Sequence, residues 1–275
     1  MKINMIKVFI TDVDGTLFDH QQMAIPDANI KAINELQQQG IKVIIATART
    51  YASSLSIVET LQLKKYGGYL IASNGGAIYD LKNGRLIDEK PIPLDGVKEL
   101  YAYAECNNLH FTVEQDDYVI TSGYDEGTAI DNLIVGSDFL LVSPHNDFLS
   151  RIKSAPMKVN FTQNKALIDS HFPLIEQLFS DRFYVCHAGD NFIDIVLKDV
   201  NKSSAVAHLL KILDCDFTDA AAIGDGDNDS WLLAKAGFSA AMGNGTALAK
   251  QSGKMLVSDC GSAGLSEFVD YLLKQ

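Results

Sequence analysis

Cysteine is scarce in this 275-residue sequence, and long hydrophobic runs are absent. The four cysteines, Cys106, Cys186, Cys215 and Cys260, form no CxxC pair and no Cys/His cluster at zinc spacing. This spread argues against a metal or redox role and favours buried free thiols. The first residues lack the apolar stretch of a signal peptide, and no run of about 18 apolar residues predicts a membrane span. We therefore expect a cytoplasmic protein that makes no contact with a membrane.

Positive charge is also in short supply. Lysine and arginine number 23 against 35 aspartates and glutamates, so the formal net charge is −12 at pH 7. Without a basic surplus, the chain is not expected to bind nucleic acid or an anionic membrane. A small phosphorylated metabolite is still compatible with this charge, because a few local cations and a metal would suffice to bind it. The acidic balance leaves the oligomeric state open.

Apolar strands and amphipathic helices alternate in the first part of the chain. Continuous apolar runs predict strands at residues 6–11, 41–46 and 69–72. Helices are predicted between them, at 26–39 and 51–61. Strands that are apolar throughout are typical of a parallel sheet covered by helices on both faces. The pattern thus predicts an α/β, Rossmann-like core, in which ligands bind at the carboxyl ends of the strands.

The middle of the chain has a different pattern. A polar connection is expected at 84–93 and a helix at 94–107. Short strands are expected at 109–113, 118–121, 139–142, 157–162 and 183–187. Paired short strands with helices between them predict an inserted α+β domain with an antiparallel sheet. We place this insert at residues 81–188.

After the insert, the alternation of strands and helices resumes. A helix is predicted at 201–213, and strands are predicted at 220–223, 239–242 and 255–258. Residues 1–80 and 189–275 are therefore expected to form one core domain, interrupted by the insert.

The first predicted strand ends in two aspartates one residue apart, Asp12 and Asp14, followed by Gly15 and Thr16. A strand that delivers two carboxylates to its tip suits a metal-assisted nucleophile. The glycine permits a tight turn, and the threonine hydroxyl and the turn amides can face an anion. An ordinary boundary between strand and turn explains the same residues, since aspartate and glycine are common in turns.

Two further candidate sites follow the pattern expected for ligands at the carboxyl ends of the strands or at the helices that follow them. The second strand leads into Thr47, Ala48 and Arg49, whose hydroxyl, amides and guanidinium could bind a phosphate. The alternative is that Thr47 caps the next helix and Arg49 is solvated. Lys202 opens the helix after the insert, although an isolated lysine is usually a surface residue.

The fourth site is the sequence Gly-Asp-Gly-Asp-Asn-Asp at 224–229, directly after an apolar strand. Such an oxygen-rich cluster suits a hard divalent cation like Mg²⁺. An acidic surface loop is the alternative. A calcium loop is disfavoured, because its twelfth position, counted from Asp225, is Ala236 where that loop needs glutamate.

Together, and in this order along the chain, the four sites resemble the haloacid dehalogenase superfamily of phosphohydrolases. The resemblance covers essentially the whole sequence, and its first and fourth motifs are the specific ones. The ending of the fourth motif is similar to the Cof-type sugar phosphatases, as are Ser-Asn-Gly-Gly-Ala at 73–77 and Ala-Met-Gly-Asn at 241–244. The resemblance implies that the insert is the larger α/β cap, type IIB, which closes over the site and selects the substrate.

The resemblance also implies roles for the charged residues. Asp12 would be the nucleophile that forms an aspartyl-phosphate, and Asp14 the general acid and base. Asp12, Asp14 and Asp225 would hold Mg²⁺, with Asp14 contributing its backbone carbonyl. Asp229 would act through a water molecule or as a support, and Lys202 would balance the charge of the phosphoryl oxygens.

Four residues would bind the substrate by the same resemblance: Thr47, Ala48, Arg49 and Asn228. Two departures from the family pattern occur. Ala48 stands where many relatives have glycine, and its methyl group could narrow the approach of the backbone to the phosphate. Ser203 stands after the motif lysine where relatives usually have glycine, which makes the lysine match less specific.

These observations predict a Mg²⁺-dependent phosphomonoester hydrolase that acts on small phosphorylated metabolites, with sugar phosphates favoured. One alternative is a phosphosugar mutase or phosphotransferase of the same superfamily. A second is a non-catalytic regulator that binds a phosphorylated metabolite. The presence of both Asp12 and Asp14 argues against the regulator, since pure binding would not need both.

Overall fold

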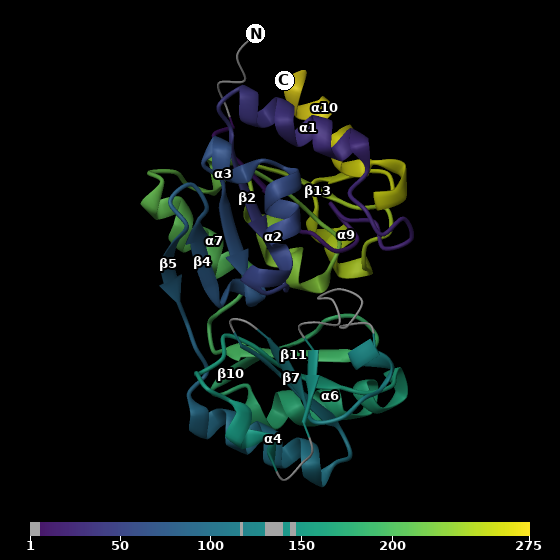
Figure 1. Cartoon of the computed structure of the whole chain (residues 1–275). Helices are drawn as coiled ribbons and strands as arrows, with labels where there is room; N and C mark the ends of the chain where they lie inside the picture. Colours follow the sequence, from purple (N-terminus) through teal and green to yellow (C-terminus); the bar gives the residue numbers. More distant parts are fainter. Residues whose placement is uncertain (1–5, 116–117, 130–139, 144–146) are drawn as a thin grey trace. The chain divides into compact units, whose positions relative to one another are not determined.

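The computed structural model describes residues 6–115, 118–129, 140–143 and 147–275. Its described residues divide into two compact units (Figure 1). Unit 1 comprises Met1–Ala48, Ser54–Asp88 and Lys202–Gln275, and unit 2 comprises Arg49–Ser53 and Glu89–Asn201. The insert thus runs from Glu89 to Asn201, where the sequence predicted 81–188.

Unit 1 is built on an eight-stranded sheet in the order β14-β13-β12-β1-β2-β3-β4-β5. Its strands are β1 (Val8–Thr11), β2 (Lys42–Ala46), β3 (Tyr69–Ala72), β4 (Ala77–Asp80), β5 (Arg85–Glu89), β12 (Ala220–Gly224), β13 (Phe238–Ala241) and β14 (Met255–Leu256). The strands from β14 to β3 are parallel, as the apolar pattern predicts, and β4 pairs antiparallel with β3. The polar connection expected at 84–93 instead contains the edge strand β5.

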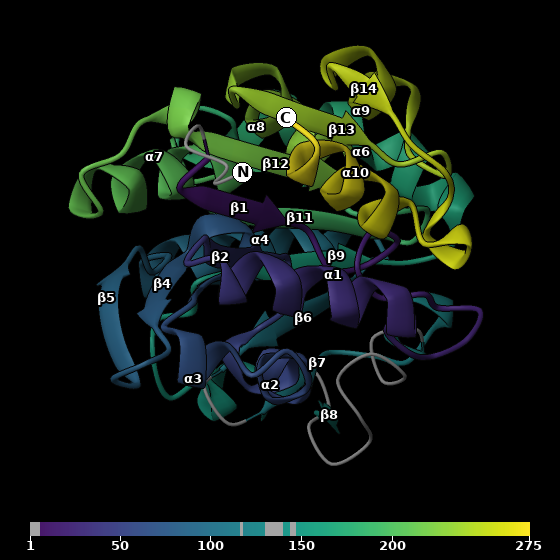
Figure 2. The ribbon, with the colours of Figure 1, turned by 90° about the horizontal axis from the view of Figure 1, so that it is seen from above.

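Helices cover the central strands on both faces (Figure 2). They are α1 (Asp27–Gln38), α2 (Tyr51–Thr60), α3 (Leu63–Tyr66), α7 (Lys202–Ile212), α8 (Ser230–Lys235), α9 (Ala247–Ser252) and α10 (Gly264–Leu273). Val8 and Ile10 pack in the core on the side of α7 and α8. Phe9, between them, points to the other face and contacts Phe268 of α10, with ring centroids 6.1 Å apart. This alternation explains why Val8, Phe9 and Ile10 of β1 are all apolar.

Unit 2 contains a six-stranded sheet in the order β10-β11-β9-β6-β7-β8. Its strands are β6 (His110–Glu114), β7 (Val119–Thr121), β8 (Leu140–Val142), β9 (Val159–Thr162), β10 (Phe183–His187) and β11 (Phe192–Leu197). The pairs are antiparallel except β7 with β8, which is parallel. Strand β11 was not predicted. Because it lies between β10 and β9, unit 2 extends past the predicted end at residue 188.

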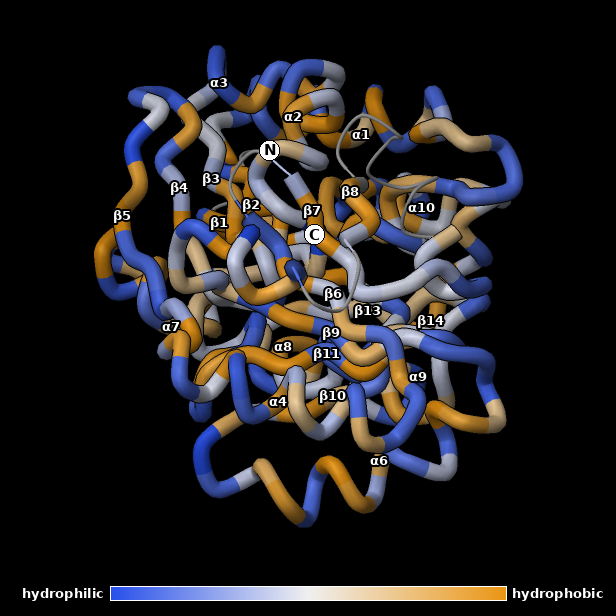
Figure 3. The backbone as a smooth tube through the Cα atoms, turned by 60° about the horizontal axis from the view of Figure 1, so that its bottom comes forward, coloured by the Kyte–Doolittle hydropathy of each residue, from blue (hydrophilic) through white to orange (hydrophobic). Residues whose placement is uncertain are grey.

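Two helices, α4 (Leu94–Cys106) and α6 (Lys165–Phe179), complete the hydrophobic core of unit 2. Hydrophobic and hydrophilic residues alternate along these helices, as expected for elements with one buried face (Figure 3). Among the described parts of the chain, no helix has both the length and the apolar character needed to cross a membrane.

Candidate active site

Asp12 and Asp225 meet at one edge of the unit 1 sheet. Strands β1 and β12 are parallel neighbours in which Thr11 is paired with Ile223, and each strand leads directly to its aspartate. The amide of Asp12 donates a hydrogen bond of 3.1 Å to the carbonyl of Ile223. Asp12 is 6% exposed, so its carboxylate is largely desolvated. The register of two adjacent strands thus brings together residues 213 positions apart in the sequence.

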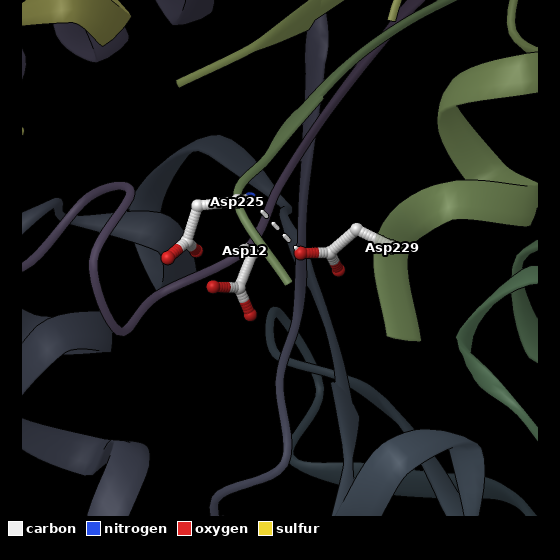
Figure 4. Close-up of side chains that lie close together, drawn as sticks. All are labelled: Asp12, Asp225 and Asp229. Carbon is white, nitrogen blue, oxygen red and sulfur yellow. Dashed lines mark hydrogen bonds between the residues drawn. The ribbon is translucent and has the colours of Figure 1, made fainter. Parts of the chain in front are cut away.

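Asp229 joins these two aspartates. Carboxylate oxygens of Asp12, Asp225 and Asp229 lie within 4.8 Å of one another, and the three groups face a common point (Figure 4). A short 3₁₀ helix at Asp227–Asp229 turns the chain back, and Asp229 Oδ2 accepts the amides of Asp225 and Gly226 at 3.1 and 3.0 Å. A Cβ on Gly224 would lie 2.5 Å from Asp229 Oδ2, so this strand must end in glycine.

Lys202 is the cation of this cluster. It is 1% exposed, and its Nζ donates to Asp12 Oδ1 at 2.6 Å and to Asp229 Oδ1 at 2.7 Å. The lysine begins helix α7, whose apolar side packs on the sheet and so holds the ammonium group at the strand tips. Charge-assisted hydrogen bonds of this length fix the orientation of both carboxylates.

The pKa values of the cluster show an excess of negative charge. Burial raises the pKa of Asp12 well above its ordinary value, and the charges of Asp229, Asp225 and Asp14 raise it further, against the opposing charge of Lys202. Burial and the charge of Asp229 raise the pKa of Asp225 to about 6. Although burial opposes it, the charges of Asp12 and Asp229 raise the pKa of Lys202. One ammonium group thus faces three carboxylates, and their hard oxygen ligands fit a divalent cation such as Mg²⁺.

Two polar side chains orient Asp225. The hydroxyl of Thr16 donates to Asp225 Oδ1 at 2.8 Å. Asn244, after strand β13, donates to the carbonyl of Gly15 at 2.8 Å and to Asp225 Oδ2 at 3.4 Å. Both residues belong to the sequence motifs described above, but these contacts were not predicted. Only the meeting of two distant loops reveals them.

Asp14 points to a different partner. Gly15 has a φ of +77°, and the tight turn that it permits separates Asp14 from the three clustered aspartates. The Oδ1 atom of Asp14 lies 2.9 Å from His20 Nε2. The two aspartates of the first motif therefore occupy distinct environments, one buried beside Lys202 and the other partly exposed.

The second predicted phosphate-binding segment lies at the tip of β2. Thr47 is fully buried, its amide donates to the carbonyl of Ile71 at 2.9 Å, and its carbonyl accepts the amide of Asn74 at 2.9 Å. Asn228 donates through its side chain to Asn74 Oδ1, also at 2.9 Å. Asn74 therefore links the Thr47 and Asn228 segments, and this link was not predicted from the sequence.

Ala48 and Arg49 fall on either side of the division between the units. Ala48 ends the first segment of unit 1, whereas Arg49 is assigned to unit 2. Arg49 is 8% exposed. The contacts of Thr47, Ala48, Arg49 and Asn228 with a phosphate stay predictions.

Comparisons with known proteins agree with this arrangement. Residues 9–269 match the haloacid dehalogenase-like hydrolase family. The chain is 26% identical over 248 residues to the 5-amino-6-(5-phospho-D-ribitylamino)uracil phosphatase YcsE of Bacillus subtilis, covering 90% of this chain and 88% of the relative. It is 25% identical over 273 residues to the HMP-PP phosphatase of Yersinia enterocolitica, covering 98% and 96%.

The structure also has close counterparts among solved structures. A haloacid dehalogenase-like hydrolase from Bacteroides thetaiotaomicron superimposes with a TM-score of 0.86 at 22% identity, covering 97% of this chain and 99% of the other. This match shows a shared fold, and the family match extends from strand β1 to helix α10. The chain therefore belongs to the haloacid dehalogenase-like hydrolase family.

Proposed function

We propose that this protein is a Mg²⁺-dependent phosphatase that hydrolyses small phosphorylated metabolites through an aspartyl-phosphate on Asp12. The observation that carries the proposal is the buried contact of Asp12 with Lys202, beside two further carboxylates. The ammonium group of Lys202 orients the nucleophile, and a neighbouring cation site can balance the charge of the phosphate. This arrangement suits attack on a phosphate ester.

The first step uses the two aspartates of the first motif. An oxygen of Asp12 attacks phosphorus, and the bond from phosphorus to the leaving oxygen breaks. Asp14 gives its proton to that leaving oxygen, so that a neutral alcohol departs. In the second step water attacks the phosphorus of the aspartyl-phosphate, Asp14 takes a proton from the water, and inorganic phosphate leaves with the carboxylate of Asp12 restored.

Asp12, Asp225 and Asp229, together with the backbone carbonyl of Asp14, would hold the metal. When bound, Mg²⁺ would neutralise charge on the phosphoryl oxygens and lower the repulsion between substrate and carboxylates. Lys202 contributes a fixed positive charge that also neutralises the phosphoryl oxygens. It also keeps Asp12 in the orientation that its hydrogen bond defines.

The substrate class is the less specific part of the proposal. The names of the two relatives specify a phosphoribityl compound and HMP-PP, which are both small phosphorylated metabolites. The Cof-type motifs at 73–77 and 224–229 favour sugar phosphates for this chain. Cytoplasmic action on such a metabolite stays a prediction, as do the absence of nucleic acid and membrane partners.

Release of inorganic phosphate tests the proposal directly. The purified chain is assayed with 4-nitrophenyl phosphate and a panel of sugar phosphates and phosphorylated cofactors, with Mg²⁺ or with excess EDTA. We expect turnover with Mg²⁺ and its loss with EDTA. Absence of turnover across the panel in the presence of Mg²⁺ would overturn the phosphatase. Transfer of phosphate to a second sugar hydroxyl, with no release to water, would favour a phosphosugar mutase.

A further inference from the structure

A histidine outside the four motifs contacts the proposed acid. The Nε2 atom of His20 lies 2.9 Å from Asp14 Oδ1, which is hydrogen-bond distance between an imidazole N–H and a carboxyl oxygen. The side chain of His20 is 42% exposed and that of Asp14 is 30% exposed. The contact is therefore partly open to solvent, unlike those of the buried Lys202.

The loop after Asp14 has a defined structure that holds this histidine. The amides of Thr16, Leu17 and Phe18 all donate to the carbonyl of Val13, and Leu17 is fully buried. The amide of Gly15 donates to the carbonyl of Phe18 at 3.1 Å. These bonds form a compact turn that fixes the backbone on both sides of Asp14.

A second set of bonds fixes His20 itself. Asp19 and Ala24 exchange amide-to-carbonyl hydrogen bonds of 2.9 and 3.2 Å, which close a short loop that begins at His20. The side chain of Asp19 accepts the amide of Gln21 at 2.9 Å. The imidazole also contacts the ring of Phe18 edge-on, with centroids 5.3 Å apart. Ring contact and loop closure together aim Nε2 at Asp14.

We propose that His20 is a positioning residue for Asp14 in the phosphatase reaction. At the 2.9 Å separation, Nε2 can donate to Oδ1 and so fix the rotation of the carboxyl group that transfers the proton. The same bond strengthens as Asp14 becomes a carboxylate, because hydrogen bonds to charged acceptors are stronger. His20 thereby supports the step in which the leaving oxygen receives its proton.

The inference rests on the proposed function, since it assigns His20 a part in the proton transfer by Asp14. It predicts that the effect of losing His20 depends on the leaving group of the substrate. A leaving group that is a weak acid needs the proton from Asp14, whereas 4-nitrophenolate leaves readily without it. Loss of the His20 contact should therefore matter most for alkyl phosphates and least for 4-nitrophenyl phosphate.

The test measures kcat/KM for 4-nitrophenyl phosphate, phenyl phosphate and an alkyl phosphate such as glycerol 1-phosphate. The variants are His20→Leu, which removes the donor, and His20→Gln, whose amide Nε2 retains one. Gln21→Ala, at the exposed neighbouring side chain, is the matched control. For His20→Leu we expect about a tenfold loss with the alkyl phosphate and less than about threefold with 4-nitrophenyl phosphate. His20→Gln should recover most of the loss.

Two outcomes would overturn the inference while the phosphatase stands. In the first, His20→Leu retains the wild-type kcat/KM with all three substrates. In the second, it loses the same factor with every substrate, which indicates a general structural effect. A wild-type chain that is inactive with all three substrates would overturn the proposed function itself, so the two failures are distinguishable.

Discussion

Each unit contains one buried lysine between two carboxylates, but the two arrangements differ. In unit 1, Lys202 Nζ lies 2.6 Å from Asp12 and 2.7 Å from Asp229. In unit 2, Lys158 Nζ lies 3.0 Å from Glu114 and 3.3 Å from Asp194. Both lysines are almost fully buried. The first arrangement lies at the ends of parallel strands. The second joins the last residue of β6, the residue before β9 and Asp194 within β11.

The difference lies in what surrounds each ion pair. At the tip of β12, Asp225 adds a third carboxylate, and its pKa is raised to about 6 by burial and by the charge of Asp229. In unit 2, Asp194 is satisfied by the ammonium group of Lys158 and the side-chain amide of Asn160. Unit 1 thus sets three carboxylates against one ammonium group, whereas unit 2 sets two, one of which also accepts a side-chain amide. The larger excess of negative charge suits a cation site, and the smaller one is compatible with an internal brace. The comparison teaches that the third carboxylate, more than the buried lysine, distinguishes the proposed active site from the ion pair in unit 2.

The largest expected effect comes from Asp12→Asn. Without the nucleophile, no aspartyl-phosphate forms, and kcat should fall by about 10⁴-fold or more. Asparagine has nearly the same size and relieves the cost of a buried charge, so the fold should persist. Phosphate release and circular dichroism measure the two effects. Retained turnover in a folded variant would remove Asp12 as the nucleophile.

Chelation of metal should have the next largest effect. EDTA is expected to abolish turnover, and Mg²⁺ should restore it. At a concentration of 100 times its dissociation constant, Mg²⁺ should also stabilise the wild type by about 2.7 kcal/mol. Thermal unfolding with and without Mg²⁺ measures this shift, with Asp225→Asn as the variant that should lose most of it. An equal shift in both proteins would place the cation elsewhere.

Removal of either lysine tests the comparison between the two units. Lys202→Met and Lys158→Met should each destabilise the unit that contains the lysine by about 3 kcal/mol, because each leaves buried carboxylates without their cation. Only Lys202→Met should abolish turnover, since Lys158 braces a sheet outside the carboxylate cluster. Amide hydrogen exchange resolves the two units, and phosphate release gives the activity. Equal losses of activity in two folded variants would contradict the distinction.

The smallest expected effect concerns the pH dependence of the metal-free protein. Because the pKa of Asp225 is about 6 in the folded state and near 3.8 when unfolded, the folded state binds its proton more tightly. Stability should therefore rise as the pH falls from about 6 to about 4, and the carboxylate should destabilise the fold above that range. At pH 7.5, Asp225→Asn should be more stable than the wild type by on the order of 1 kcal/mol.

Urea unfolding in EDTA at pH 7.5 and pH 4.5 measures this difference. The advantage of Asp225→Asn should shrink at the lower pH, where the wild-type carboxyl is protonated in the folded state. Mg²⁺ at pH 7.5 should reverse the order of stability. The cation attracts the carboxylate of Asp225 in the wild type, and Asp225→Asn lacks this charge. An advantage of Asp225→Asn that does not change with pH would rule out charge repulsion as its cause.

The central part of the fold and site was predictable, because adjacent parallel strands bring their carboxyl ends together. Asp12 and Asp225 each follow an apolar strand, so their meeting depends on register alone. The burial of Lys202 was not predictable from composition, since an isolated lysine is usually exposed. The resemblance of the four motifs predicted a role for Lys202 in the site, but not its burial.

The missed features depend on contacts between distant segments. Strand β11 contains Asp194 in an otherwise apolar run, and this aspartate is tolerated because Lys158, 36 residues earlier, pairs with it. Strand β5 is a largely exposed edge with the sequence Arg-Leu-Ile-Asp-Glu, so its polar character suggested a connection. The contact between His20 and Asp14 likewise depends on how the loop closes between Asp19 and Ala24.

Direct detection of phosphate on Asp12 tests the account most sharply. The enzyme is quenched in acid during turnover of a phosphate ester with Mg²⁺, reduced with borohydride and digested for mass spectrometry. Borohydride converts an aspartyl-phosphate to homoserine, so the account predicts homoserine at position 12 and unchanged aspartate at position 14. Unmodified Asp12 in an enzyme quenched at full activity, or homoserine at another aspartate, would contradict it.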